Sequence, residues 1–143
     1  MISTSNIEQA KRLIKSEKNP IIIEAQDENF NRKILEYGKF DILLSIEKTK
    51  QQDKSKQLDS GLNHILAEIA SKNKVAIGIN FEEISRLNKK AKAQRLARIK
   101  QNIKICRKAK ADIKIINYRD KLNAFNLLIS LGASSQQAKK AIS

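Results

Sequence analysis

The run Val75-Ala76-Ile77-Gly78-Ile79 is the clearest strand signal in the chain, and the pattern around it decides the fold. A short, continuous apolar run with β-branched residues is typical of a strand that is covered on both faces, as in parallel sheets. Three more runs have this character: Ile21–Ile23, Phe40–Leu44 and Ile113–Ile116. The sequence therefore predicts at least four short, buried strands.

Apolar residues recur at helical spacing in the segments between these runs. The expected helices cover residues 6–17, a segment from Asp27 to Gly38, a segment capped by Asp59 or Ser60, residues 89–110, a segment closed by Gly132, and a last turn capped by Ser134 or Ser135. Strands that alternate with helices predict a parallel sheet with right-handed crossovers. A doubly wound sheet and a (β/α) barrel both fit this order.

Length and composition indicate one domain over residues 1–143 with a substantial core, since 41% of the residues are apolar. The polar stretch 47–58 has no periodicity, and we expect a mobile surface loop there. No apolar run is long enough to span a membrane, and the N-terminus lacks the apolar centre of a secretory signal. A single cysteine, Cys106, fits a reducing compartment, so we expect a cytoplasmic protein.

All of the net charge of +14 comes from the second half of the chain. Residues 1–71 carry 11 Lys/Arg and 11 Asp/Glu, whereas residues 72–143 carry 18 and four. No acidic residue lies between Glu83 and Asp112, but eleven basic residues do: Arg86, Lys89, Lys90, Lys92, Arg95, Arg98, Lys100, Lys104, Arg107, Lys108 and Lys110. Like charges repel, so such a stretch indicates a polyanionic partner, and nucleic acid is the first candidate.

The basic stretch also has helical periodicity. Leu96, Ile99, Ile103 and Cys106 lie three or four residues apart and predict one apolar stripe on a long helix. Lys90, Arg98, Lys104 and Lys108 are expected on the opposite half, facing solvent. Aromatic residues make up only 4% of the chain, which favours contacts to the phosphate backbone and the shape of a folded nucleic acid over base stacking, and this pattern fits RNA and DNA alike.

Two segments resemble the central signature of a known family: Asp59–Leu66 (DSGLNHIL) and Lys74–Asn80 (KVAIGIN). The similarity continues in register over about 120 residues, through Pro20–Glu24, Asn31–Lys33, Phe40–Leu43, Leu131–Ala133 and Ala138–Ala141. The family is that of archaeal ribonuclease P thirty-kilodalton subunits, also called ribonuclease P protein component 3. The chain departs from it in lacking the N-terminal strand, which makes it a shortened member, and in having the short segment Asn117–Asp120 in place of a longer loop.

The resemblance implies a TIM-like barrel, but a full barrel takes about 250 residues. We therefore expect an α/β fold, a reduced TIM-like (β/α) barrel or open half-barrel with about four to five parallel strands and about six helices. An open parallel sheet has unpaired edges. The N-terminal helix is the expected cover, and self-association into a homo-oligomer is the alternative.

The resemblance also implies a function. Family members bind the catalytic RNA of ribonuclease P, together with a smaller RNA-binding protein subunit, and assist removal of the 5′ leader from tRNA precursors. The RNA supplies the catalysis and binds the Mg²⁺, so we expect no catalytic residue, metal or cofactor in this chain. The chain would then be one component of an endoribonuclease and would not catalyse hydrolysis by itself.

A secondary RNA contact is expected where helix N-termini and loops after strands meet, because helix N-termini bind phosphate. The candidates are Ser60, Gly61, Asn63, His64, Asn80 and Arg119. His64 is the sole histidine, and the chain has no Cys-x-x-Cys pair, which weighs against a metal site.

Two alternatives stay open at this level. A small metal-dependent phosphoesterase on a truncated barrel would cleave phosphoesters without RNA. A general nucleic-acid chaperone would bind unrelated duplexes equally well.

Overall fold

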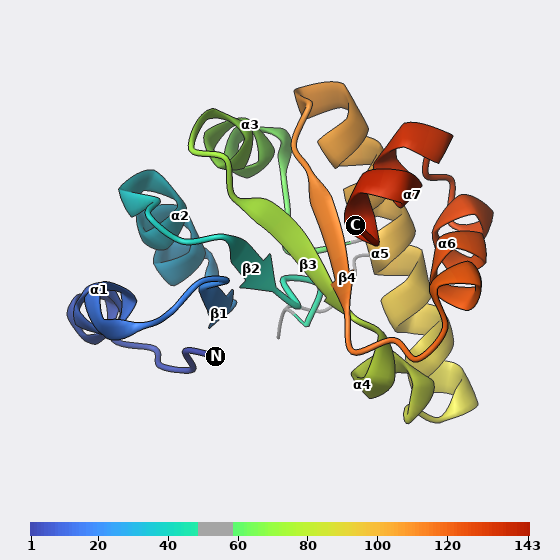
Figure 1. The fold of residues 1–143 in the computed structure, drawn as a ribbon, viewed down its shortest axis with the longest axis horizontal. Coiled ribbons are helices and arrows are strands. Elements are labelled where there is room, and N and C mark those ends of the chain that lie inside the picture. The colour runs from blue at the N-terminus through green and yellow to red at the C-terminus, as the bar shows by residue number, and fades with distance from the viewer. Residues whose placement is uncertain (49–58) are drawn as a thin grey trace.

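The computed structural model describes residues 1–48 and 59–143 and contains one parallel sheet with helices beside it (Figure 1). In chain order the elements are α1 (Ile7–Ser16), β1 (Ile22–Glu24), α2 (Glu28–Tyr37), β2 (Ile42–Leu44), α3 (His64–Lys72), β3 (Ala76–Asn80), α4 (Phe81–Ser85), α5 (Lys89–Ala109), β4 (Ile113–Ile116), α6 (Lys121–Ser130) and α7 (Ser135–Ala141). The predicted strands are all present, with bounds that differ by at most two residues.

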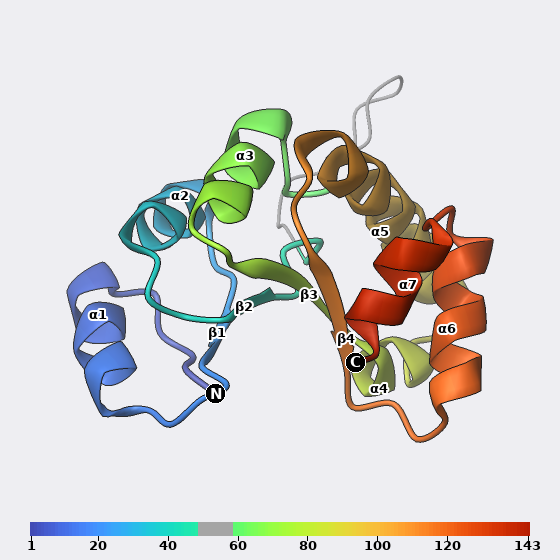
Figure 2. The same ribbon diagram turned by 45° about the horizontal axis from the view of Figure 1, so that its top comes forward.

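The strands are hydrogen-bonded in the order β1-β2-β3-β4, so each strand lies beside the next one in the chain. A doubly wound sheet would reverse direction at a switch point, whereas a barrel adds strands in sequence. Helices α1, α2, α3 and α5 follow one another in an arc beside the sheet (Figure 2). The fold is thus an open half of a TIM-like barrel, as the sequence predicts.

The two faces of the sheet differ in what they contact. Ile23, Leu43 and Ile77 belong to the main hydrophobic core, which includes the buried sides of the helices. Ile42 and Leu44 point to the opposite face, where Ile42 is in register with Ala76 and Leu44 with Gly78. A side chain at Gly78 would collide with Ile42, so this face requires a glycine there.

The β1 edge of the sheet is covered by a different segment from the one predicted. At the β1 edge, the N–H of Ile2 donates to Ile22 (2.8 Å) and the N–H of Glu24 donates to the carbonyl of Ile2 (2.9 Å), while α1 packs on α2. The segment before the N-terminal helix therefore covers this edge, and the helix itself does not. On the other side α7 packs on β4, where the Tyr118 hydroxyl donates to the carbonyl of Ile142 (2.9 Å).

Several predicted helix ends are confirmed and others are wrong. Asp27 and Ser134 are the N-caps of α2 and α7, as predicted. Helix α3 is capped by Asn63 and not by Asp59 or Ser60. The described residues form seven helices where the sequence predicts about six, because the short α4 is separate from α5. Most of the predicted loop 47–58 lies outside the described residues, but Glu47 at its start is buried.

Gly61 lies three residues before the start of α3 and has a conformation that favours glycine. Gly61 has φ +78°, and its N–H donates to Asp59 Oδ1 (3.0 Å). A Cβ atom at this position would collide with the backbone carbonyl oxygen of Ile46. Both the backbone conformation and the close approach therefore require glycine.

Replacing Gly61 with alanine should lower the free energy of unfolding by about 2–4 kcal/mol, through backbone strain and overpacking. Gly132→Ala is the matched control, because Gly132 also has a positive φ (+96°) but no atom lies within 4 Å of the point that a methyl group would occupy there. We expect it to cost about 1 kcal/mol. Urea denaturation would measure both, and equal losses would contradict the close-approach argument.

Candidate nucleic-acid interface

The long helix α5 presents a row of cations to solvent. Asn88 caps its N-terminus, and its 21 residues extend for about 30 Å. Six basic residues lie exposed on the side away from the core, and we call them the cationic row: Lys89, Lys90, Lys100, Lys104, Arg107 and Lys108. Arg107 also donates to the carbonyl of Gly132 (2.8 Å). Among the described residues, no ion pair involves a member of this row.

The opposite side of α5 packs on the sheet and its neighbouring helices. Ile99, Ile103 and Cys106 are buried, as predicted, and Leu96 is half-buried. Burial raises the pKa of the Cys106 thiol to about 12, with a smaller contribution from Asp112, so this cysteine stays a neutral core residue. The hydrophobic contacts of this side fix the direction in which the cationic row points.

Arg95 lies between two carboxylates, although the sequence predicts that it contacts RNA. It is only 9% exposed. Its Nη2 atom is 3.2 Å from Glu47 Oε1, and its Nη1 atom is 3.0 Å from Glu83 Oε1. Lys48 joins the network through Glu83 (3.1 Å) and through Glu24 (3.6 Å). Arg95 is thus part of an internal ionic network and does not present its charge to a ligand.

Arg98 and Asn102 continue this polar line along α5. Arg98 is 6% exposed, and its Nη1 donates to the carbonyl of Glu47 (3.2 Å). Asn102 Nδ2 donates to the carbonyl of Ser60 (3.2 Å). The prediction that Arg98 faces solvent is wrong, because the side of the helix that packs on the molecule extends past the apolar stripe to include it.

The two carboxylates of the network respond to different surroundings. Burial raises the pKa of Glu47 above its ordinary value, even though Arg95 works to lower it. Partial burial also works to raise the pKa of Glu83, but hydrogen bonds from Arg95 and Lys48 outweigh it and hold that pKa below its ordinary value. Glu83 is therefore the carboxylate whose ionised form the fold favours.

The remaining basic residues of the predicted interface differ in their exposure. Arg86 is exposed and paired with Glu82 at 2.6 Å, Lys92 is half-buried, and Lys110 is exposed at the end of α5, where it adopts a left-handed conformation. These three residues therefore flank the cationic row without belonging to it.

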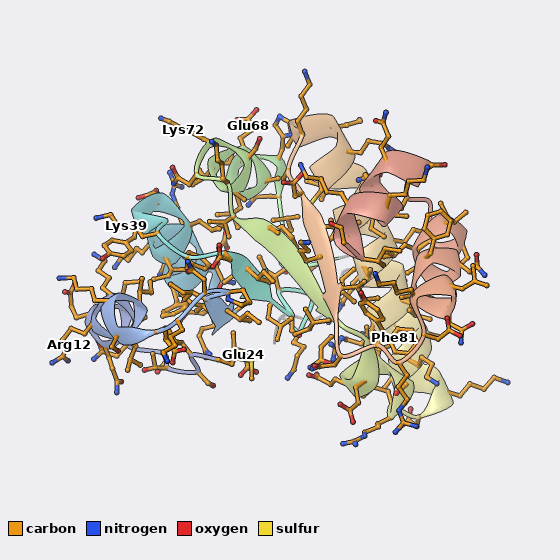
Figure 3. All side chains as sticks on the ribbon, viewed as in Figure 1. Arg12, Glu24, Lys39, Glu68, Lys72 and Phe81 are labelled. Atoms are coloured by element: carbon orange, nitrogen blue, oxygen red, sulfur yellow. The ribbon has the colours of Figure 1, made fainter. Side chains whose placement is uncertain are left out.

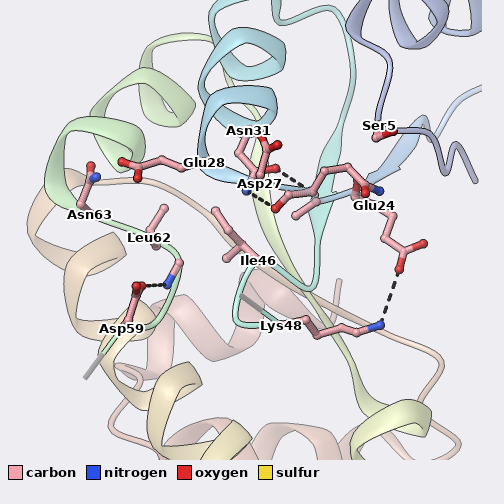
Figure 4. Close-up of a pocket in the computed structure, with 13 residues that line it drawn as sticks. Ser5, Glu24, Asp27, Glu28, Asn31, Ile46, Lys48, Asp59, Leu62 and Asn63 are labelled. Atoms are coloured by element: carbon pink, nitrogen blue, oxygen red, sulfur yellow. Dashed lines mark hydrogen bonds and ion pairs between the residues drawn. The ribbon is translucent and has the colours of Figure 1, made fainter. Parts of the chain in front are cut away.

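Two of the predicted secondary contacts line a cavity of about 460 Å³ at the carboxyl ends of β1 and β2 (Figure 4). They are Gly61 and Asn63, but four carboxylates line the cavity as well: Glu24, Asp27, Glu28 and Asp59. Lys48 also lines the cavity and is paired with Glu24 (3.6 Å), but the carboxylates outnumber it, and this net negative charge repels phosphate.

Two further residues of the predicted group, Ser60 and His64, lie outside this cavity wall. Ser60 is 1% exposed, and its hydroxyl donates to the carbonyl of Leu62 (3.3 Å). His64 is exposed at the first turn of α3, where its Nε2 lies 2.7 Å from Glu68 Oε1. Ser60 carries no charge, and a carboxylate already accompanies His64, so neither position attracts phosphate strongly.

The last two predicted contacts lie at the carboxyl ends of β3 and β4. Asn80 caps α4 and accepts from Asn117 Nδ2 (3.3 Å). Arg119 is exposed and lines a cavity of about 600 Å³ together with Arg86 and two carboxylates, Glu82 and Asp120. These positions follow strands, as the sequence predicts, and they bring two arginines to one end of the sheet.

Sequence reasoning missed the acidic partners of this region. Glu47 falls in a polar stretch without periodicity, and nothing in that pattern marks it as buried. Among residues 1–48 and 59–143, no group of three His, Cys, Asp or Glu side chains could hold a metal ion. Over the same residues, no helix has the length and apolar character needed to cross a membrane.

Replacing Glu83 with glutamine should lower stability near pH 7 by about 1–2 kcal/mol, because it removes the charge that Arg95 and Lys48 contact. Screening by solvent limits this loss of stability, since the Glu83 side chain is 31% exposed. The pKa of Glu83 is depressed, so its contribution is present above the ordinary value of 4.5 and is lost as the pH falls through the folded-state pKa.

Urea denaturation of wild type and variant at about pH 7 and about pH 3 would therefore show a stability gap that narrows in acid. Glu82→Gln is the matched control, because the exposed pair of Glu82 with Arg86 is worth at most about 0.5 kcal/mol. A gap for Glu83→Gln that does not change with pH would contradict the assignment.

Comparison with known proteins agrees with the family that the sequence resembles. No family model matches the chain. Ribonuclease P protein component 3 of Methanococcus maripaludis strain C6 is 32% identical over 110 residues, which cover 75% of this chain and 44% of that protein. The namesake proteins of Methanocaldococcus jannaschii and Methanosarcina mazei are 28% and 30% identical, over 88% and 79% of this chain.

One solved structure is similar over almost the whole chain. A chain of the cryo-EM structure of archaeal ribonuclease P with mature tRNA matches with a TM-score of 0.80 and 25% identity, over 98% of this chain and 62% of that one. The present chain spans about half the length of the curated relatives that it matches. Sequence and fold agree that the chain is a homologue of ribonuclease P protein component 3 over about half of that protein's length.

Proposed function

We propose that this chain is a non-catalytic, RNA-binding protein subunit of ribonuclease P that supports the catalytic RNA during removal of tRNA 5′ leaders. The cationic row of α5 carries the proposal, because its six exposed charges lie along one helix and meet no carboxylate among the described residues. Such a row matches the regular charge of a nucleic-acid backbone.

Nine of the eleven basic residues of the predicted interface remain in this proposal, because Arg95 and Arg98 are engaged inside the molecule. Arg86, Lys92 and Lys110 flank the row, and Arg119 adds one exposed cation at the carboxyl end of the sheet. The proposed partners are the ribonuclease P RNA, the precursor tRNA through that RNA, and a smaller protein subunit. Mg²⁺ would belong to the RNA.

The triple variant Lys100→Glu, Lys104→Glu, Lys108→Glu should bind ribonuclease P RNA at least tenfold more weakly at moderate salt. For each phosphate contact that is lost, the negative slope of log affinity against log salt should become shallower by about 0.9, the value that applies to duplex nucleic acid. Filter binding between about 50 and about 500 mM salt would measure both quantities.

The matched control is Lys15→Glu, Lys33→Glu, Lys72→Glu, which changes the net charge equally at exposed positions on α1, α2 and α3. We expect it to keep most of the affinity. Equal loss in both variants would mean that net charge alone, and not the cationic row, governs binding.

Recovery of the bound RNA would separate this function from a general nucleic-acid chaperone. The tagged chain, purified from its native host, should carry ribonuclease P RNA as its most enriched transcript. In a direct assay it should bind that RNA at least tenfold more tightly than an unrelated duplex of equal length. Equal affinity for both would favour the chaperone.

A further inference from the structure

A second surface of α5 is apolar and lies beside α4 and α6. The three helices enclose a groove of about 420 Å³, and Phe81 lies at its α4 end, where the chain leaves β3 (Figure 3). The apolar lining residues are Phe81, Ile84, Leu96 and Leu127, and the polar ones are Ser85, Lys92, Asn123, Asn126 and Ser130. Among the described residues, no acidic side chain lines the groove.

A separate apolar strip lies on another side of α6. Leu122, Phe125 and Ile129 are spaced three and four residues apart, so they share one side of this helix. Leu122 is 64% exposed and Ile129 is 39% exposed, and they are two of the four large hydrophobic residues exposed in the described part of the chain. None of these three residues lines the groove, whose α6 wall consists of Asn123, Asn126, Leu127 and Ser130, so they form a neighbouring surface and the occupant is inferred from the groove alone.

The rim of the groove is positively charged. Lys92 lines it, and Lys89 lies one turn earlier on the same side of α5. On α4, Glu82 is already paired with Arg86 at 2.6 Å. An occupant must therefore supply apolar side chains for the floor and negative charge for the rim.

These requirements favour one class of partner. An RNA would satisfy Lys89 and Lys92, but its phosphates gain nothing from Ile84, Leu96 and Leu127. A second copy of this chain would bring the same positive rim and a net charge of +14. An amphipathic helix with leucine-like anchors and acidic flanks meets both requirements, since such helices bind in grooves through residues at i, i+3 or i+4, and i+7.

We propose that the groove between α4, α5 and α6 docks an acidic amphipathic helix of a protein partner. The inference rests on the proposed function in that a ribonucleoprotein subunit contacts both RNA and protein. No member of the cationic row lines the groove, and of the nine basic residues in the proposed RNA interface only Lys92 does, so variants at other positions test the two kinds of binding separately.

The first test uses a labelled, end-capped peptide of about 14 residues, roughly four helical turns, with leucines at helical spacing and glutamates between them. We expect fluorescence anisotropy to detect binding to the chain. A peptide with lysine in place of each glutamate should bind at least tenfold more weakly, and so should a peptide with serine in place of each leucine. Failure of the acidic peptide to bind, or equal binding of all three, would overturn the proposal.

Variants then locate the site. Asn126→Trp fills the groove from a position on its lining and should weaken binding of the acidic peptide at least tenfold, and Lys92→Glu should weaken it about fivefold. Asn29→Trp, at an exposed position on α2, is the matched control and should bind as wild type does. Equal effects of the two tryptophans would overturn the assignment to this groove.

The second test identifies the natural occupant. A photoactivatable cross-linking residue at position 126, introduced into the full chain in its native host, should form adducts with an acidic, amphipathic segment of another protein. Adducts with RNA, adducts with a second copy of this chain, or no adducts would each overturn the proposal.

The two proposals fail in distinguishable ways. Asn126→Trp should leave binding to ribonuclease P RNA unchanged, and charge reversal at Lys100, Lys104 and Lys108 should leave binding of the acidic peptide unchanged within about twofold. If the wild-type chain binds the acidic peptide but not ribonuclease P RNA, the proposed function fails and the groove stands. If it binds that RNA but not the peptide, the groove fails and the proposed function stands.

Discussion

Three polar side chains of α5 contact the residues just after β2 and those shortly before α3. Arg95, Arg98 and Asn102 occupy positions i, i+3 and i+7, so they lie in line on one side of the helix. The two arginines contact Glu47, just after β2, and Asn102 contacts Ser60, shortly before α3. A buried guanidinium is tolerated only when carboxylates and carbonyls replace the lost water, and leaving one unpaired costs about 3–5 kcal/mol. The position of α5 on the sheet therefore depends on Glu47 and Glu83 as well as on its apolar stripe.

Contacts on the buried side of α5 explain how this helix stays folded despite its positive charge. Lys100, Lys104 and Lys108 are four residues apart, and like charges at this spacing destabilise a helix by about 0.2–0.5 kcal/mol per pair. Burial of Ile99 and Ile103 outweighs this cost, at about 1.5–3 kcal/mol for each fully buried side chain. The helix is thus held in shape by contacts on one side, while a polyanion bound to the other side would relieve the repulsion there.

The fold could be predicted from the sequence because the strands are short apolar runs and several helices begin at strong capping residues. Ser134, for example, forms a full capping box with Gln137. The cap of α3 was harder to place, because Asp59, Ser60 and Asn63 are all good capping residues and only the tight turn at Gly61 selects the last. The interior arginines could not be predicted either. Periodicity separates apolar from charged residues, but it does not reveal that a distant carboxylate such as Glu47 will meet a charge on the buried side.

Charge is also divided between two regions of the half-barrel. The cavity beside β1 and β2 is walled by Glu24, Asp27, Glu28 and Asp59, whereas the surface from α4 to the end of α5 is strongly positive. A polyanion that approaches the molecule is repelled by the first region and attracted by the second, so the field orients it before any contact forms. The neutral half of the sequence supplies β1 and β2, and the basic half supplies β3 and β4, so the two halves of the chain form the two halves of one sheet. A composition bias that is visible in the linear chain thereby becomes a directional property of the surface.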